Sequence, residues 1–259
     1  MLRAGTSVSQ PGRGNDAPDA GARFLGARRV LRELDASGER FERADAPLPE
    51  GRLGRDVWLT SGLMYFIAAA DPRQALAAHS RTTASYAVLL GRAMGIGEGK
   101  FLLDLERGAL LHDIGKSAVP GPILEKAGPL GSLEREIVRE HPVVGFRMLE
   151  EFGFLRPAAE IVLCHHERYD GHGYPAGLRG DRIPLGARIL AVADALDALT
   201  ADRVYSRARP MEEAMGEIAR SGGRHFDPAV VDVFLTVAAG AWLAAGRGAA
   251  GPVRPPSVH

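Results

Sequence analysis

Apolar residues recur at three- and four-residue spacing along most of the chain beyond about residue 56. This period places them on one face of a helix. It predicts helices over 57–70, 75–94, 101–111, 133–151, 158–166, 187–201, 211–220 and 229–243. Proline near several starts and glycine near several ends are typical of helix termini. The strict alternation of a half-buried strand is scarce, so the pattern predicts an all-α fold.

The two ends of the chain differ from this helical middle. Glycine, proline, alanine and serine dominate both ends without periodic apolar spacing. We therefore expect 1–55 to be a mostly disordered segment and 246–259 to be a disordered tail. A weak amphipathic pattern over 23–45 is consistent with a helix in that part of the segment. The stretch 56–245 is then the folded helical domain.

Neither a signal peptide nor a membrane span is expected. Polar residues interrupt the N-terminus throughout, which argues against a secretory signal. The most apolar long window, 229–246, contains Asp232 and barely reaches the length of a span, which favours a packed terminal helix.

Charge and cysteine content narrow the partners and the compartment. Lys plus Arg and Asp plus Glu are both 32, so the formal net charge is zero. We therefore expect neither a nucleic-acid polymer nor a membrane as a partner, and any anionic ligand must be held by local groups. Cys164 is the one cysteine, so no internal disulfide can form, which fits a cytoplasmic location. Its apolar surroundings, IVLCHH, are typical of a small core residue.

The longest irregular stretch, 168–184, contains YDGHGYPAGLRGDRIP. It is too long and too rich in specific polar and aromatic residues for a simple linker, which suggests a functional loop. Gly171 and Gly173 permit backbone conformations closed to other residues, and Pro175 stiffens the exit. The loop can thus hold Tyr174 in a defined place.

Histidine and aspartate provide the strongest chemical pattern. Five of the eight histidines and two aspartates fall where helix faces or ends can point them into one pocket: His79, His112, Asp113, His141, His165, His166 and Asp194. Imidazole with carboxylate suits Fe, Mn, Zn or Ni, and an adjacent His-Asp pair lets the carboxylate bridge two ions. Burying so many polar groups unpaired would cost several kcal/mol each, on the order of the desolvation penalty for such groups. The other histidines, His172, His225 and His259, are interpreted as solvated or structural.

Three strings together resemble the HD-GYP subgroup of the HD-superfamily metal-dependent phosphohydrolases. They are HDIGK at 112–116, HHERYDGHGYP at 165–175 and ARILAVADALDALTADRVYS at 187–206. The likeness covers roughly 71–235. It implies an HD-type helical bundle with a long ordered GYP loop.

The resemblance also implies an activity. Members of the subgroup are cyclic di-GMP phosphodiesterases that give pGpG and often GMP at a metal centre. Carried onto this sequence, one ion would bind His79, His112, Asp113 and Asp194, and the other Asp113, His141, His165 and His166. A hydroxide shared by the ions would be the nucleophile, with Asp113 as the bridge. The expected cofactor is two divalent ions, Fe or Mn, with other transition metals left open.

Substrate contacts are also implied by the resemblance. Lys116 would meet the scissile phosphate as a catalytic point charge, Tyr174 would contact guanine or phosphate, and Arg203 would contact phosphate. Glu167 and Asp170 are expected to orient the metal-bound imidazoles.

Two departures from the subgroup matter. Members with three metals carry a glutamate where this chain has Ala75, so we expect two ions, with Asp197 losing a metal partner. Ser206 stands where many members have a second basic residue, which Arg207 or Arg209 could replace. Affinity and product range therefore stay open.

Two other functions remain open. One is a non-catalytic module of the same fold that binds a cyclic dinucleotide, or a protein through the N-terminal helix or the GYP face. The other is an HD phosphohydrolase acting on a different nucleotide, such as a mixed cyclic dinucleotide. The oligomeric state is not indicated by the sequence.

Overall fold

The computed structural model describes residues 75–202 and 207–249, so the predicted helices at 23–45 and 57–70 lie outside the described residues. Within them the α-helices are α3 (Ala75–Ala93), α4 (Lys100–Leu111), α5 (Gly121–Leu124), α6 (Ser132–Arg139), α7 (His141–Leu149), α8 (Arg156–Cys164), α9 (Leu185–Thr200), α10 (Met211–Arg220), α11 (Pro228–Thr236) and α12 (Ala239–Ala249). Short 3-10 helices are η1 (Ile114–Ala118), η2 (Gly153–Leu155) and η3 (Gly180–Arg182). Gly222 and Phe226 form an isolated β-bridge that is not part of a strand. The all-α prediction is confirmed.

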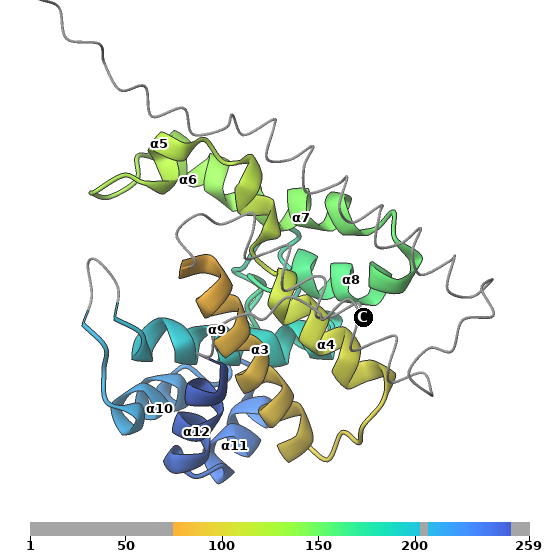
Figure 1. Cartoon of the computed structure of the whole chain (residues 1–259), viewed down its shortest axis with the longest axis vertical. Coiled ribbons are helices and arrows are strands. Elements are labelled where there is room, and N and C mark those ends of the chain that lie inside the picture. Colours follow the sequence, from red (N-terminus) through yellow and green to blue (C-terminus); the bar gives the residue numbers. More distant parts are fainter. Residues whose placement is uncertain (1–74, 203–206, 250–259) are drawn as a thin grey trace, which may run out of the picture.

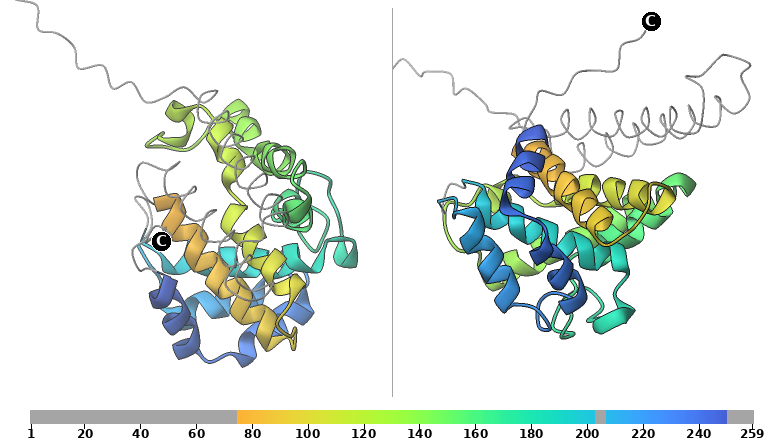
Figure 2. Two further views of the ribbon diagram at one scale, coloured as in Figure 1. Left: turned by 45° about the vertical axis from the view of Figure 1, so that its right-hand side comes forward. Right: turned by 90° about the horizontal axis from the view of Figure 1, so that it is seen from below.

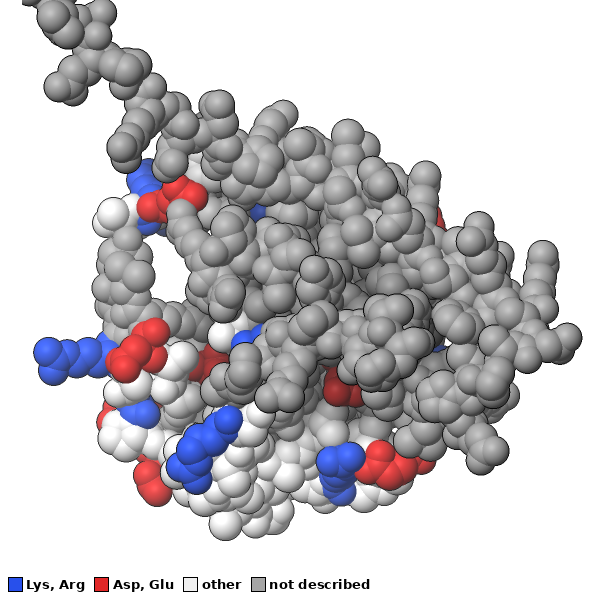
Figure 3. Space-filling view, viewed as in Figure 1, with Lys and Arg blue, Asp and Glu red and all other residues white. Residues whose placement is uncertain are grey.

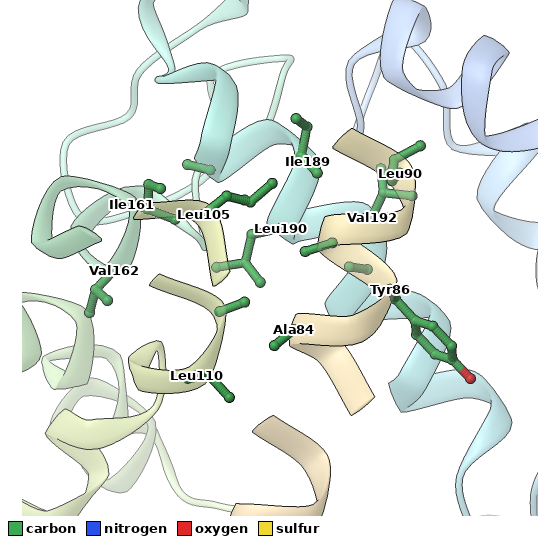
Figure 4. Close-up of a cluster of buried hydrophobic side chains, with 14 of the residues drawn as sticks. Ala84, Tyr86, Leu90, Leu105, Leu110, Ile161, Val162, Ile189, Leu190 and Val192 are labelled. Carbon is green, nitrogen blue, oxygen red and sulfur yellow. The ribbon is translucent and has the colours of Figure 1, made fainter. Parts of the chain in front are cut away.

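The core lies where α3, α4 and α9 pack together. Leu90 of α3, Leu105 of α4 and Leu190 of α9 are fully buried there, and Ile161 of α8 and Val192 extend the cluster (Figure 4). Burying such side chains stabilises the fold by about 1.5–3 kcal/mol each. The three helices are thereby fixed relative to one another.

The remaining helices flank this centre on two sides (Figures 1 and 2). On one side α8 packs on α4, and α7 packs on α8 and η1. On the other side α12 packs on α3, and α10 packs on α9. Helices α5 and α6 lie at the end of the molecule away from α10, α11 and α12 (Figure 1).

The single helix predicted over 133–151 is wrong, because the chain forms α6 and α7 with a break at Glu140. Pro142 has no backbone N–H, so it cannot donate to the Val138 carbonyl four residues earlier. The freed carbonyl oxygen lies 2.7 Å from Nδ1 of His141 instead. The proline thus ends one helix and provides an anchor for a histidine.

The single helix predicted over 229–243 is also wrong, because α11 and α12 meet at an angle of 92°. In a straight helix Trp242 would lie about 12 Å along the axis from Phe234. The bend brings the ring centroids of Phe234 and Trp242 to within 5.0 Å of each other. The Tyr86 ring of α3 also packs on Trp242, with the centroids 5.7 Å apart. Trp242 is fully buried as a result.

The described helices are short or only moderately apolar in comparison with a membrane span. No single helix in 75–202 or 207–249 combines the length and apolar character that a span requires. The bent pair α11 and α12 meets those two criteria only when taken together. Val230, Val231 and Phe234 of α11 are buried within the helical domain.

The surface carries both signs of charge. On the face seen in Figure 3, Lys and Arg side chains are interspersed with Asp and Glu over the described residues. This distribution agrees with the formal net charge of zero. A ligand with several negative charges would therefore depend on cations placed at its own site.

Candidate metal centre

Three histidines lie where a helix ends. His112 caps α4, His165 caps α8, and His141 follows the end of α6 after one residue. Each Nδ1 lies 2.7 Å from the carbonyl oxygen three residues earlier, on Ala109, Val162 and Val138 respectively. The last carbonyls of a helix lack a backbone partner, and these imidazoles supply one. Because a carbonyl oxygen only accepts, each Nδ1 carries the hydrogen and each Nε2 keeps its lone pair.

His79 is held differently, by carboxylates of α9. Its Nδ1 lies 2.6 Å from Oδ2 of Asp197, and its Nε2 lies 3.3 Å from Oδ1 of Asp194. The packing of α9 against α3 brings these side chains together. His79 Nε2 also lies 3.2 Å from His112 Nε2. The imidazole is thus aimed at the same point as the histidine that ends α4.

The donor atoms form two groups. In the first group, His79, His112 and Asp113, the donor atoms lie within 4.8 Å of one another. The same limit holds for the second group, His141, His165 and His166. Asp194 adjoins the first group through His79. Imidazole nitrogens with carboxylate oxygens are suitable ligands for first-row divalent ions.

Asp113 faces both groups at once. Its Oδ2 lies 3.5 Å from His112 Nε2 and 4.0 Å from His79 Nε2. Its other oxygen, Oδ1, lies 3.4 Å from His141 Nε2. The carboxylate is nearly inaccessible to solvent, and Nζ of Lys116 lies 2.7 Å from Oδ2. One carboxylate therefore lies between the two sets of imidazoles, as a bridging ligand must.

Gly115 makes this position possible. A Cβ atom at Gly115 would lie 2.0 Å from the His141 carbonyl oxygen and 2.7 Å from the backbone nitrogen of Gly145. Only glycine allows η1 to approach the backbone of α7 so closely. The HDIGK string thus needs its glycine to bring Asp113 against His141.

The second group contains an arrangement that calls for a cation. His141 Nε2 and His165 Nε2 lie 3.3 Å apart, and both rings donate through Nδ1 to carbonyl oxygens. Two neutral imidazoles in these tautomers direct lone pairs at each other, so neither can donate a hydrogen bond to the other. A positive ion shared by the two nitrogens resolves this repulsion. The residues present therefore fit a metal ion.

Burial keeps these imidazoles neutral. It lowers the pKa of His141 to about 4 and, with the help of His141, that of His166 to about 3. Burial also lowers the pKa of His165 well below its usual value. Neutral imidazole is the form that binds a metal ion.

The carboxylates of the first group attract positive charge. Burial lowers the pKa of His79, but hydrogen bonds to Asp194 and Asp197 outweigh burial and raise it to about 9. Burial alone would raise the pKa of Asp113. Lys116 and the nearby imidazoles lower it by more, so the net pKa is well below the usual value. Asp194 is likewise shifted down, with burial opposed by His79. The first group is therefore an anionic cavity that suits a divalent cation.

The GYP loop packs directly on the second group. A Cβ atom at Gly173 would lie 2.3 Å from the Arg168 nitrogen and 2.6 Å from the His166 carbonyl oxygen. The next residue, Tyr174, donates its N–H to that same oxygen at 3.2 Å, and its ring lies 4.8 Å from the His166 ring. Gly171 has a φ of 82°, as predicted for a glycine-only conformation, whereas Gly173 serves close approach instead.

Glu167 and Asp170 do not have the predicted role. Both oxygens of Glu167 accept backbone N–H groups of the loop, from Ala176 at 2.7 Å and Leu178 at 3.0 Å. Asp170 accepts from the Arg168 guanidinium and from the His172 N–H. The expectation that these carboxylates orient imidazoles is therefore wrong, because they hold the loop itself.

The structure brings together most of the side chains singled out from the sequence. The two groups, Asp194 and Lys116 surround one point, and Tyr174 lies at its edge. Arg203 lies outside the described residues, so its predicted role stays a prediction. Sequence reasoning missed Arg139, whose guanidinium carbon lies 5.1 Å from the Tyr174 ring centroid. Its position two residues before His141 was the available clue.

Comparison with known proteins identifies the family of this chain. Residues 64–230 match the HD domain family. The chain is 43% identical over 148 residues to a cyclic di-GMP phosphodiesterase of Thermotoga maritima, covering 56% of this chain and 40% of that protein. It is 38% identical over 160 residues to a 3'3'-cGAMP-specific phosphodiesterase of Vibrio cholerae, covering 61% of this chain and 30% of that protein.

The fold is similar to a solved HDGYP protein from Bdellovibrio bacteriovorus, with a TM-score of 0.52 at 19% identity over 86% of this chain and 74% of that one. The chain belongs to the HD domain family. The resemblance to the HD-GYP subgroup is thereby confirmed. The chain spans less than half the length of the two curated relatives.

Proposed function

We propose that this chain is a metal-dependent phosphodiesterase that hydrolyses a cyclic dinucleotide, with cyclic di-GMP as the first substrate to test. The observation that carries the proposal is the position of Asp113. Its two oxygens lie 3.5 Å from His112 and 3.4 Å from His141, one toward each imidazole group. The name of the Thermotoga maritima relative supports the choice of substrate.

The proposed ligands are those of the two groups together with Asp194. When bound, two divalent ions lower the pKa of water and stabilise the charge that develops on phosphoryl oxygens. Fe(II) and Mn(II) are the proposed ions. Asp113, held ionised by Lys116 and its imidazole neighbours, is the proposed bridge.

Residues of the chain also hold and neutralise the substrate in this proposal. Nζ of Lys116, 2.7 Å from Asp113, places a positive charge beside the bridging carboxylate, where the scissile phosphate would bind. Burial raises the pKa of Tyr174 to about 12, so its hydroxyl stays protonated and can donate a hydrogen bond to the ligand. Arg203 is the proposed further phosphate contact. The proposed product is pGpG, with GMP from a second hydrolysis.

A mixed cyclic dinucleotide is a second candidate substrate, which the name of the Vibrio cholerae relative favours. A substrate panel separates the two. Protein purified without oxygen is loaded separately with Fe(II) and Mn(II), then given cyclic di-GMP, 3'3'-cGAMP or cyclic di-AMP, and the products are separated by chromatography.

The proposal predicts metal-dependent conversion of cyclic di-GMP to pGpG that a chelator stops. The Asp113→Ala variant is expected to lack this conversion. Preferred turnover of 3'3'-cGAMP would replace the substrate but retain the reaction. Two bound ions with tight binding and no turnover of any of the three would contradict the proposal and favour the non-catalytic binding module.

A further inference from the structure

Arg139 is fixed beside the second group by its place in the chain. It is the last residue of α6, and His141 begins α7 two residues later. The preceding residue, Val138, accepts the Nδ1 hydrogen of His141 at 2.7 Å. The backbone on both sides of Arg139 is therefore anchored to the same histidine.

The side chain of Arg139 reaches over the GYP loop. Its guanidinium carbon lies 5.1 Å from the centroid of the Tyr174 ring, which is within the range of a cation–π contact. The Tyr174 ring lies 4.8 Å from the His166 ring, with the two planes 30° apart. A guanidinium, a phenol ring and a histidine of the second group thus follow one another from the rim of the site inward.

Within the described residues, no oxygen acceptor engages the guanidinium of Arg139, whereas neighbouring cations have one. Lys116 pairs with the Asp113 carboxylate, and Arg135, one turn earlier on α6, donates to the Leu130 carbonyl oxygen at 2.9 Å. Within residues 75–202 and 207–249, Arg139 contacts the Tyr174 ring and forms no ion pair with a carboxylate. The side chain is exposed, so the N–H groups at its edge are available to a ligand.

A cyclic dinucleotide needs such a cation. It has two phosphodiester groups, and hydrolysis engages only one of them at the metal centre. A chain with zero net charge offers the other phosphate no general attraction, so a local cation must meet it. The planar guanidinium matches two phosphate oxygens at once, and its contact with an aromatic ring holds it ready for them.

We propose that Arg139, held in place by the Tyr174 ring, binds the second, non-scissile phosphate of the substrate. This inference rests on the proposed function, and it assigns Arg139 a substrate-binding role. The Tyr174 ring then positions Arg139, in addition to the hydrogen bond to the ligand proposed for the Tyr174 hydroxyl. Lys116 then lies at the reacting phosphate and Arg139 at the one that is retained, in addition to the phosphate contact proposed for Arg203.

The test compares substrates with one and two phosphodiesters. Arg139→Ala, Arg139→Lys and the matched control Arg135→Ala are assayed on cyclic di-GMP and on bis(p-nitrophenyl) phosphate, which has a single phosphodiester. For Arg139→Ala we expect KM for cyclic di-GMP to rise about tenfold more than KM for the single diester, with kcat changed less. This size matches the loss of one hydrogen-bonded charge contact. Arg139→Lys should recover part of the loss, and Arg135→Ala should behave as wild type.

Two further comparisons test the mechanism of binding. A phosphate contact predicts an equal loss of affinity for cyclic di-GMP and cyclic di-AMP, whereas a loss confined to the guanine ligand would overturn the proposal. Because Tyr174 positions Arg139, Arg139→Ala should cost less in a Tyr174→Ala background than in wild type. Additive losses would contradict that part of the proposal.

Failure of this inference is distinguishable from failure of the proposed function. If wild type cleaves the single diester but none of the three cyclic dinucleotides, the proposed function fails. Calorimetric binding of cyclic di-GMP to the Mn(II)-loaded wild type and Arg139→Ala proteins then tests Arg139 alone. A tenfold weaker affinity in the variant supports the inference, and equal affinity, or no binding to either protein, overturns it.

Discussion

Nδ1 of His79 donates to Oδ2 of Asp197 at 2.6 Å, whereas Nδ1 of His112, His141 and His165 donates to backbone carbonyl oxygens. The carbonyls are supplied by the helix ends themselves. The Asp197 carboxylate is a side chain of α9, so the orientation of His79 depends on one residue that can be substituted. A carboxylate partner also makes the imidazole a stronger ligand.

Asp197→Asn should weaken the first metal site. The amide oxygen can still accept a hydrogen bond, but the negative charge that strengthens His79 as a ligand is gone. We expect the affinity of the first site for Mn(II) to fall about tenfold, within the range seen for such outer partners. Calorimetric titration of metal-free protein with Mn(II) measures this directly.

The matched control is Asp181→Asn. Asp181 pairs with Arg188, seven residues later in the chain, and its side chain is 85% exposed. It removes the same charge without touching His79, so its Mn(II) affinity should equal that of wild type. Equal affinity in Asp197→Asn and wild type would refute the role assigned to the carboxylate.

Gly115→Ala should destabilise the protein and separate Asp113 from His141. The added Cβ would lie 2.0 Å from the His141 carbonyl oxygen, a backbone atom that cannot move without displacing α7. We expect the free energy of unfolding to fall by about 1–3 kcal/mol, as overpacking does. Chemical denaturation of the metal-free protein gives the value.

Gly97→Ala serves as the control for this substitution. Gly97 lies in a loop where a Cβ meets nothing within 4 Å. Its effect should stay within about 0.5 kcal/mol, as for ordinary surface changes. Similar stability of the two variants would show that the close approach at Gly115 does not matter.

Glu167→Ala should loosen the GYP loop while both metal groups stay intact. Glu167 is 2% exposed, and its oxygens are the acceptors for the N–H groups of Ala176 and Leu178. Without them these two amides should exchange with solvent faster, by about tenfold or more, since each loses a charge-assisted hydrogen bond. Hydrogen exchange read at single residues measures this, with the core amide of Leu190 as an internal reference.

Glu167→Gln retains one acceptor oxygen and should lie between wild type and Glu167→Ala. Turnover should fall in Glu167→Ala while the metal content remains that of wild type, because the loop carries Tyr174. Unchanged exchange at both amides would mean that the loop is held by other contacts.

The sequence predicted the helical class correctly, and the histidines and aspartates that it singled out lie close together in the structure. Apolar spacing reports which face of a helix is buried, as with Leu90 and Leu105, which are fully buried. A buried cluster of imidazoles and carboxylates is costly without a shared function, so its members could be recognised together.

Other features depended on tertiary contacts that local pattern does not report. The bend between α11 and α12 is set by the burial of Trp242 between Tyr86 and Phe234, which come from elements far apart in the chain. Glu167 accepts hydrogen bonds from Ala176 and Leu178 because the GYP loop folds back over it. Pro142 indicates a helix break in the sequence, but the continuous apolar spacing over 133–151 favoured one helix.

The central claim is that Asp113 bridges two divalent ions. Its most direct test is electron paramagnetic resonance of the Mn(II)-loaded protein, with metal content measured on the same sample. The account predicts two Mn(II) per chain and the spectrum of an exchange-coupled pair, as close two-metal sites give, with the coupling lost in Asp113→Ala. One ion per chain, or two ions with the spectra of isolated Mn(II), in the wild type would contradict it.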